Sequence, residues 1–180
     1  FQANAVVIGN LTYDGTYISG DGRTYVGLDT IAAWDYATTL AATTEVDGPY
    51  EGFRIANTAD ADFFIGSLFG ASNDNCSTVD GTASNMTICG TLSGWTDGDF
   101  GGNHNSLYEY FFFFADETDG VEVGRTIMNS ENDLVVQFER GFTFGDSDAY
   151  SGSDDANITW LLLRDTSVQV DEPSILALMA

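Results

Sequence analysis

Apolar and polar side chains alternate over the first 30 residues, and turn residues interrupt this alternation at short intervals. Strand candidates lie at residues 6–8 and 17–19, and Asp14-Gly15 and Asp21-Gly22 are dipeptides typical of tight turns. The pattern predicts short antiparallel strands that are joined by hairpins.

The hydrophobic period changes at residue 31 and predicts a first helix over residues 31–43. Thr30 is a suitable N-cap, and Asp47-Gly48-Pro49 is expected to prevent the helix from continuing. At helical spacing, one face of this helix carries Trp34, Ala37, Leu40 and Ala41.

Asn57 or Thr58 is expected to cap a second helix, which ends before Gly70. Its first turn contains Asp60 and Asp62, whose negative charges suit the positive end of the helix dipole. The face predicted to be buried consists of Ala61, Phe64, Ile65 and Leu68.

Residues 71–106 are rich in Gly, Asn, Asp and Thr, which predicts long loops. Strand candidates follow at residues 107–115, 121–128, 134–140 and 158–164. Strands, two helices, loops and strands in this order predict an α+β fold built on an antiparallel sheet, with two short helices and long disulfide-bearing loops. We expect one globular domain at residues 1–166 and a C-terminal tail at residues 167–180.

Four consecutive phenylalanines occupy residues 111–114 of one strand candidate. Because side chains alternate between the two faces of a strand, two of the four must face away from the core. Either a helix covers that second face, or it contacts another subunit.

The charge balance is extreme, with 28 acidic residues, five arginines and no lysine, for a net charge of -23. This charge repels nucleic acid and anionic lipid, and it favours divalent cations. Without lysine the chain has no lysine isopeptide crosslink, no Schiff base and no P-loop lysine.

Cys76 and Cys89 bracket a short polar loop, and we expect them to form one disulfide in an exported protein. Closing a loop of this length contributes roughly 3 kcal/mol in the chain-entropy model. A zinc site that includes His104, the single histidine, is the less favoured alternative.

A calcium site is the candidate metal site. Residues 145–155 alternate aspartates with Gly and Ser, and this arrangement offers the hard oxygen ligands that Ca²⁺ requires. The segment lacks the spacing of an EF-hand, and the alternative interpretation is a solvated acidic hairpin. The candidate ligands are Asp146, Asp148, Asp154 and Asp155.

Catalytic signatures are weak. His104 with Asp97 and Asp99 lacks any accompanying nucleophile motif such as Gly-x-Ser-x-Gly. Glu109 and Glu122 fall on neighbouring strand candidates, but in a chain with 28 acidic residues such a pair is expected by chance. We therefore expect that the protein is not an enzyme.

The last ten residues read Asp-Glu-Pro-Ser-Ile-Leu-Ala-Leu-Met-Ala. They resemble the PEP-CTERM signal of exported bacterial proteins, whose core is Pro-Glu-Pro followed by Ser/Thr-x-Leu-Ala-Leu. Asp171 replaces the first proline, and the basic cluster that ends such signals is missing. The resemblance implies secretion to the bacterial cell surface. Since six apolar residues cannot span a bilayer, which takes roughly 20, we expect no stable membrane span here and a truncated or processed signal.

The tail also carries apolar residues that require burial if the tail is ordered. It either folds back onto the edge of its own sheet or adds as a strand to a neighbouring subunit, which is the alternative we favour. The candidate assembly residues are Val168, Val170, Ile175, Leu176, Leu178 and Met179.

A second resemblance is weaker. Trp34-Asp35-Tyr36-Ala37 and the segment Tyr-Glu-Gly-Phe-Arg-Ile-Ala-Asn-Thr at residues 50–58 resemble a stretch of secreted bacterial domains with a C-type-lectin-like fold. Phe53 stands where that family has Trp, and the usual proline after the Arg motif is missing. The resemblance implies that a helix follows the Arg motif, and that residues 160–165 form a closing strand.

Composition and resemblance together favour an extracellular structural protein of the bacterial surface or biofilm matrix, which self-associates into a homo-oligomer or filament. The alternative is a calcium-dependent carbohydrate-binding module with a C-type-lectin-like fold, whose partner is an extracellular polysaccharide. The two hypotheses share a secreted location, and neither involves nucleic acid.

Overall fold

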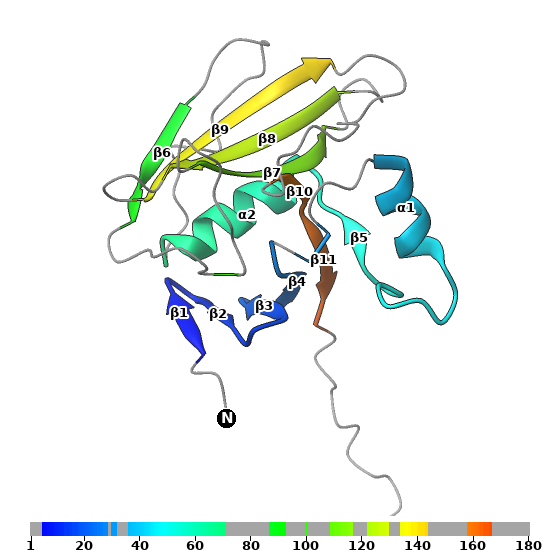
Figure 1. Cartoon of the computed structure of the whole chain (residues 1–180). Helices are drawn as coiled ribbons and strands as arrows, with labels where there is room; N and C mark the ends of the chain where they lie inside the picture. The colour runs from blue at the N-terminus through cyan, green and yellow to red at the C-terminus, as the bar shows by residue number, and fades with distance from the viewer. Residues whose placement is uncertain are drawn as a thin grey trace, which may run out of the picture.

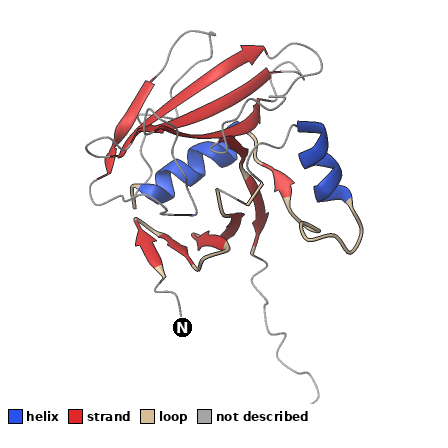
Figure 2. Cartoon of the chain, viewed as in Figure 1, coloured by secondary structure: helices blue, strands red, loops and turns tan. Residues whose placement is uncertain are grey.

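The computed structural model describes residues 5–28, 30–31, 36–70, 87–92, 100, 109–116, 122–129, 134–143 and 158–166. Within these residues, two β-sheets lie on opposite sides of helix α2 (Thr58–Leu68), and helix α1 (Tyr36–Thr44) lies to one side (Figure 1). Figure 2 shows the same arrangement by type of element. The prediction of an α+β fold with antiparallel pairing and two helices is confirmed at this level.

The larger sheet begins with the predicted hairpins. Strands β1 to β4 follow one another in the chain and pair in antiparallel fashion. The Asp14 carboxylate helps to close the second turn, because its Oδ1 accepts hydrogen bonds of 2.8 Å from the N–H groups of Thr16 and Tyr17. The sheet has the order β1-β2-β3-β4-β11-β5, with bounds β1 (Val6–Ile8), β2 (Leu11–Tyr13), β3 (Tyr17–Gly20), β4 (Arg23–Val26), β11 (Leu162–Asp165) and β5 (Arg54–Ile55).

A second, five-stranded sheet has the order β10-β7-β8-β9-β6, and the sequence pattern did not separate its strands from those of the larger sheet. Its strands pair in antiparallel fashion except β10, which lies parallel to β7. Strand β6 forms inside residues 71–106, where we predicted only loops. The bounds are β6 (Thr87–Leu92), β7 (Glu109–Asp116), β8 (Glu122–Asn129), β9 (Leu134–Thr143) and β10 (Ile158–Trp160).

The predicted strand at residues 158–164 is two strands, which belong to different sheets. Leu161 lies between β10 and β11, and its carbonyl accepts a 2.8 Å hydrogen bond from the N–H of Ala56. The Ala56 carbonyl in turn accepts a 2.8 Å hydrogen bond from the N–H of Ala115 in β7. Residues 160–163 are all buried, so no alternation in the sequence marks the point where the chain changes sheet.

Helix α2 confirms its prediction closely. Asn57 is the N-cap, and its side chain accepts a hydrogen bond from the N–H of Asp60, while the Asp60 carboxylate accepts one from the N–H of Asn57. Gly70, after the last turn, has a φ of 68°, a conformation that suits glycine. The predicted face is fully buried, with 0% exposure at Ala61, Phe64, Ile65 and Leu68.

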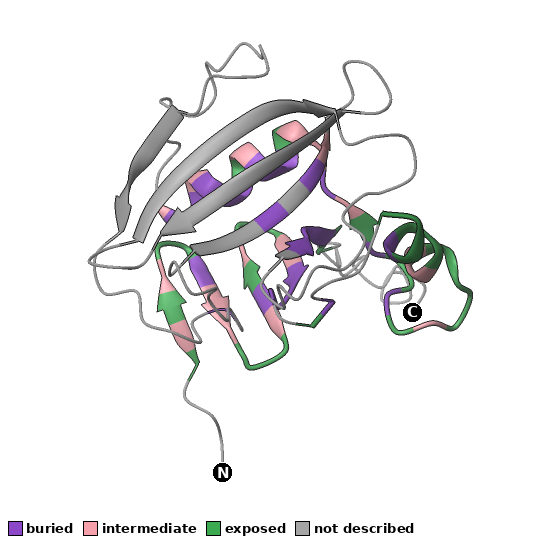
Figure 3. Cartoon of the chain, turned by 45° about the horizontal axis from the view of Figure 1, so that its top comes forward, coloured by how far each residue is buried: buried purple, intermediate pink, exposed green. Residues whose placement is uncertain are grey.

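Helix α1 differs from its prediction in orientation. Residues 32–35 of the predicted range, with Trp34, lie outside the described residues, and the rest of the predicted face, Ala37, Leu40 and Ala41, is exposed, with Leu40 43% exposed (Figure 3). The buried residue is Thr39, and the Tyr36 ring lies edge-on to Trp160 with centroids 5.1 Å apart. Because Ala and Thr occur all around this helix, the contact with Trp160 decides which face packs.

The main hydrophobic core lies between the two sheets, around α2. Phe64 contacts Tyr25 of the larger sheet and Phe112 of the smaller one, with ring centroids 4.8 Å and 5.3 Å apart. Phe112 and Phe114 are both fully buried on this side, so α2 covers one face of the phenylalanine run. A second core lies on the other face of the larger sheet and contains Val26, Ile31, Tyr50, Phe53, Trp160 and Leu162.

The turn between β1 and β2 packs against the C-terminal end of α2. The N–H of Asn10 donates a 2.8 Å hydrogen bond to the Ser67 carbonyl. Gly9 has a φ of 57°, and a Cβ atom there would lie 2.2 Å from the Leu68 carbonyl oxygen. Only glycine fits this close approach.

Candidate functional site

Three arginines lie on neighbouring strands of the larger sheet, and they sort to its two faces. Arg23 on β4 and Arg54 on β5 point to the face that α2 covers, where both meet Asp60. Arg164 on β11 points to the opposite face, because Leu163 before it belongs to the core around α2. Successive side chains of a strand alternate in this way.

On the α2 face, Asp60 is the centre of a charged group that we call the Asp60 cluster, made of Asp60, Arg23, Arg54 and Asp165. Arg54 binds the Asp60 carboxylate with both terminal nitrogens, of which Nη2 lies 3.0 Å from Oδ1. Arg23 Nη1 lies 3.1 Å from the same oxygen, and Arg23 Nε lies 3.5 Å from Asp165 Oδ1. The cluster joins the first turn of α2 to three strands.

Opposing effects set the pKa of Asp60. Burial alone raises it, but hydrogen bonds from Arg54 and from the Asn57 N–H, together with the charges of Arg54 and Arg23, outweigh burial and lower the pKa below 3.8. The Asp60 side chain is 4% exposed, so the carboxylate is a buried anion with full pairing. Because each of its contacts stabilises the position of α2, we interpret the Asp60 cluster as structural.

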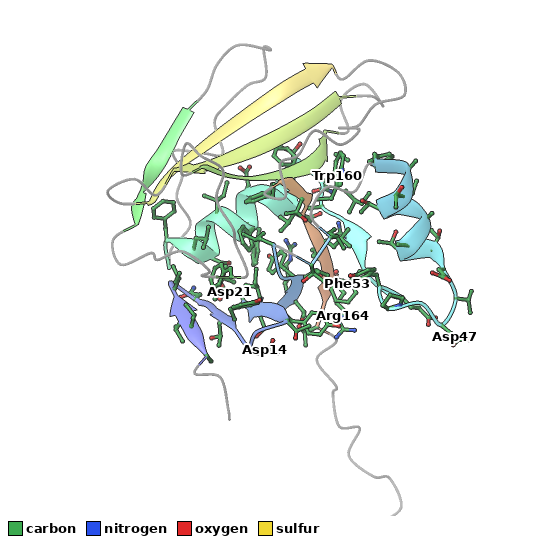
Figure 4. The ribbon with its side chains drawn as sticks, viewed as in Figure 1. Asp14, Asp21, Asp47, Phe53, Trp160 and Arg164 are labelled. Carbon is green, nitrogen blue, oxygen red and sulfur yellow. The ribbon has the colours of Figure 1, made fainter. Side chains whose placement is uncertain are left out.

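On the opposite face, Arg164 lies over two aromatic rings, and we call Arg164, Tyr17 and Phe53 the arginine–aromatic cluster (Figure 4). The guanidinium carbon lies 4.7 Å from the Phe53 ring centroid and 5.8 Å from that of Tyr17. The two rings are stacked, with centroids 5.8 Å apart and planes 13° apart. The Tyr50 ring lies edge-on to the Phe53 ring, with centroids 6.4 Å apart. The exposed Arg164 guanidinium thus lies on a group of packed aromatic rings.

The arginine–aromatic cluster is suited to binding an anionic group. A guanidinium over aromatic rings keeps its N–H donors at the edge of the plane, where they match a carboxylate or phosphate in a two-pronged geometry. Phe53 is only 5% exposed and contacts both Tyr17 and Arg164, so it offers little ring surface for stacking on a sugar. Among the residues that the structure describes, this exposed cation is therefore the strongest candidate for a binding group.

The predicted site residues fall mostly outside the described residues. This holds for Cys76, for the candidate calcium ligands Asp146, Asp148, Asp154 and Asp155, and for the six assembly residues of the tail, Val168, Val170, Ile175, Leu176, Leu178 and Met179. Cys89 lies in β6, at the edge of the smaller sheet, next to an irregularity in its pairing with β9. The disulfide and the calcium site stay predictions.

Two further observations concern chemistry. Glu109 pairs in register with Asn129, and Glu122 pairs with Asp116, so the two glutamates lie at opposite ends of the β7–β8 pair. Seven residues of strand span about 23 Å, which is too far for the carboxyl pair of a glycosidase, about 5 to 10 Å apart. In the described ranges, no three His, Cys, Asp or Glu side chains gather in a group that could hold a metal ion.

Sequence reasoning missed the arginine–aromatic cluster. Its members lie at residues 17, 53 and 164, and only the pairing of β11 with β4 and β5 brings them together. One available signal was the scarcity of arginine. The chain has only five arginines and 28 acidic residues, so the position of each arginine is informative.

Comparison with known proteins gave no match to any family model, curated protein or solved structure. Neither described helix is long and apolar enough to cross a membrane.

Proposed function

We propose that this protein is a non-enzymatic structural component of the bacterial cell surface or biofilm matrix, which is secreted and self-associates through strand addition. The resemblance of the C-terminus to an export signal supports the location. The large negative charge and the absence of lysine support an extracellular role without nucleic acid or lysine crosslinks.

The open edge of the larger sheet carries this proposal. Strand β1 is the outermost strand, and within the described part of the chain no strand pairs with its outer side. Its sequence is Val-Val-Ile, and Val7 is 66% exposed. Soluble proteins commonly protect such edges with charged residues, proline, a bulge or a very short strand. Strand β1 is short, with three residues, but it has neither charge nor proline. An apolar edge without charge or proline is suited to receive another strand.

We propose that the C-terminal tail of a neighbouring copy, residues 167–180, supplies that strand. Its apolar residues match the apolar edge, and main-chain hydrogen bonds give affinity while alternate side chains set the register. A contact from the tail of one copy to β1 of the next is heterologous, so repetition makes an open fibre unless the rotation closes a ring.

The test compares two lysine variants of the full chain. Val7→Lys places a charge on the β1 edge, and Leu40→Lys makes the same change at an exposed position of α1 that is 43% exposed. We expect Val7→Lys and a deletion of residues 167–180 to abolish assembly in sedimentation velocity and electron microscopy, while Leu40→Lys assembles as wild type does. Assembly that survives both Val7→Lys and the deletion would overturn strand addition.

One observation favours the alternative function, a calcium-dependent carbohydrate-binding module with a C-type-lectin-like fold. The Arg motif within residues 50–58 and the closing strand that the resemblance implies are adjacent strands, with Leu162 in register with Ile55 and Leu163 with Arg54. Helix α2 follows the Arg motif directly, as the resemblance implies. Binding to a glycan array that a calcium chelator abolishes would favour this alternative over a structural role.

A further inference from the structure

No described carboxylate pairs with the guanidinium group of Arg164. Its guanidinium contacts the rings of Phe53 and Tyr17, and among the described residues no carboxylate lies within ion-pair distance of it. The other two arginines with described side chains, Arg23 and Arg54, both bind Asp60. Among the three arginines with described side chains, Arg164 is therefore the exception.

The turn between α1 and β5 has the complementary chemistry. Glu45, Val46 and Asp47 are all exposed, and Val46 is 78% exposed, the largest value among the exposed large hydrophobic residues described. The turn is held by hydrogen bonds: the Asp47 N–H donates to Glu51 Oε2 at 3.0 Å, and the Gly48 N–H donates to the Glu45 carbonyl at 3.2 Å. Two carboxylates thus flank an exposed valine on a constrained turn.

The turn and the arginine–aromatic cluster of one chain do not meet. Figure 4 shows Asp47 at the tip of the turn and Arg164 on the sheet, well apart. Arg164 is also separate from the β1 edge, because four strand spacings lie between β11 and β1, a distance of about 19 Å, and Tyr17 on β3 lies two spacings from β1, about 10 Å. A second copy could therefore reach the cluster without competing for β1.

We infer that the acidic turn of one copy, residues 45–47, binds the arginine–aromatic cluster of a second copy. This inference rests on the proposed self-association and adds a polar contact to the strand contact. A carboxylate of the turn binds the Arg164 guanidinium, and Val46 lies against the half-buried Tyr17 ring. Copies of charge -23 repel at long range, so association benefits from a local match of opposite charges.

The experiment uses charge reversal in the full chain. Arg164→Glu and Glu45→Arg each place like charges across the contact, and we expect each variant alone to raise the dissociation constant for self-association at least about tenfold. When the two variants are mixed in equal amounts, the reversed pair can form between unlike copies, and sedimentation velocity should show association restored toward that of wild type. Circular dichroism checks that both variants fold.

Controls separate this inference from the proposed function. Ala41→Glu, on the exposed face of α1, and Arg164→Gln each make the net charge more negative by one. Only Arg164→Gln should weaken association. If wild type associates and Arg164→Gln matches Ala41→Glu, this contact is wrong while strand addition stands. If wild type stays monomeric, the proposed self-association fails, and this contact fails with it. Binding of a uronic acid oligosaccharide that requires Arg164, without rescue in the mixture, would assign the cluster to a glycan instead.

Discussion

The arginines on the two faces of the larger sheet differ in whether a described carboxylate binds them. On the face toward α2, Arg23 and Arg54 converge on the buried Asp60 carboxylate. On the other face, Arg164 is exposed and lies over Phe53 and Tyr17. The sheet is the same, and the residue type is the same, so the difference comes from what packs on each face.

The difference follows from the cost of removing charge from water. Asp60 is buried because it caps α2, and a buried carboxylate is stable only when it is paired and hydrogen-bonded. The two arginines supply that pairing. Arg164 stays in contact with water, and its described contacts are aromatic rings, so among the described residues its hydrogen-bond donors stay available. One face thus uses arginine for stability, and on the other face we propose that arginine serves binding.

Removing the Asp60 carboxylate should have the largest effect on stability and is the strongest test of this difference between the two faces. Asp60→Ala leaves Arg23 and Arg54 without their shared partner and removes half of the capping box. We expect the free energy of unfolding, measured with urea, to fall by about 3 to 5 kcal/mol. Glu45→Gln, which removes an exposed carboxylate, should change it by less than about 0.5 kcal/mol. Equal effects of the two changes would show that Asp60 is not a structural anion.

The sequence was sufficient to predict α2 but not the partners of Asp60. The cap, the first-turn aspartate and the buried face are all local signals within residues 57–70, and all were confirmed. The arginines that bind Asp60 come from β4 and β5, and their approach depends on strand pairing with β11. Local patterns carry no information about such long-range pairing.

At helix α1 and at Leu161, where the chain crosses between sheets, the sequence pattern was also insufficient. Alanine and threonine occur on all sides of α1, so its hydrophobic period was too weak to predict which face packs. The contact of Tyr36 with Trp160 determines the packed face. Residues 160–163 are all buried, so they show no alternation of apolar and polar residues. The sequence pattern therefore did not reveal where the chain leaves one sheet and enters the other. In both places the sequence pattern identified an element but not its surroundings.

Lowering the pH should weaken the Asp60 cluster without changing the sequence. The folded-state pKa of Asp60 lies below its ordinary value of 3.8. A lowered carboxyl pKa contributes stability that is present above about pH 3.8 and lost as the pH falls through the folded-state pKa. We therefore expect the stability difference between wild type and Asp60→Asn to be constant from pH 5 to 7 and to shrink below about pH 3.8. A difference that stays constant down to pH 2 would contradict the ion pairing.

A smaller change separates the cap of α2 from its ion pairs. Asn57→Ala removes the side-chain oxygen that accepts from the Asp60 N–H at 2.9 Å, and it leaves both arginines on the Asp60 carboxylate. The expected loss of stability is about 1 kcal/mol, the usual value for an N-cap. Asn57→Asp keeps a capping oxygen, but it places a second carboxylate beside Asp60. If Asn57→Ala costs as much as Asp60→Ala, cap and ion pairs act as one unit.

The smallest effect on stability should come from Arg164, and it sharpens the comparison most. Arg164→Gln removes an exposed guanidinium whose described contacts are ring faces, so we expect the free energy of unfolding to fall by no more than about 1 kcal/mol, the size of an exposed cation–π contact. Arg54→Gln is the matched change on the other face, and it removes both Arg54 hydrogen bonds to a buried carboxylate, so its loss should be clearly larger. Urea unfolding of the two variants under one set of conditions measures both values. If Arg164→Gln is the more destabilising of the pair, Arg164 is a structural residue and the two faces of the sheet use arginine in the same way.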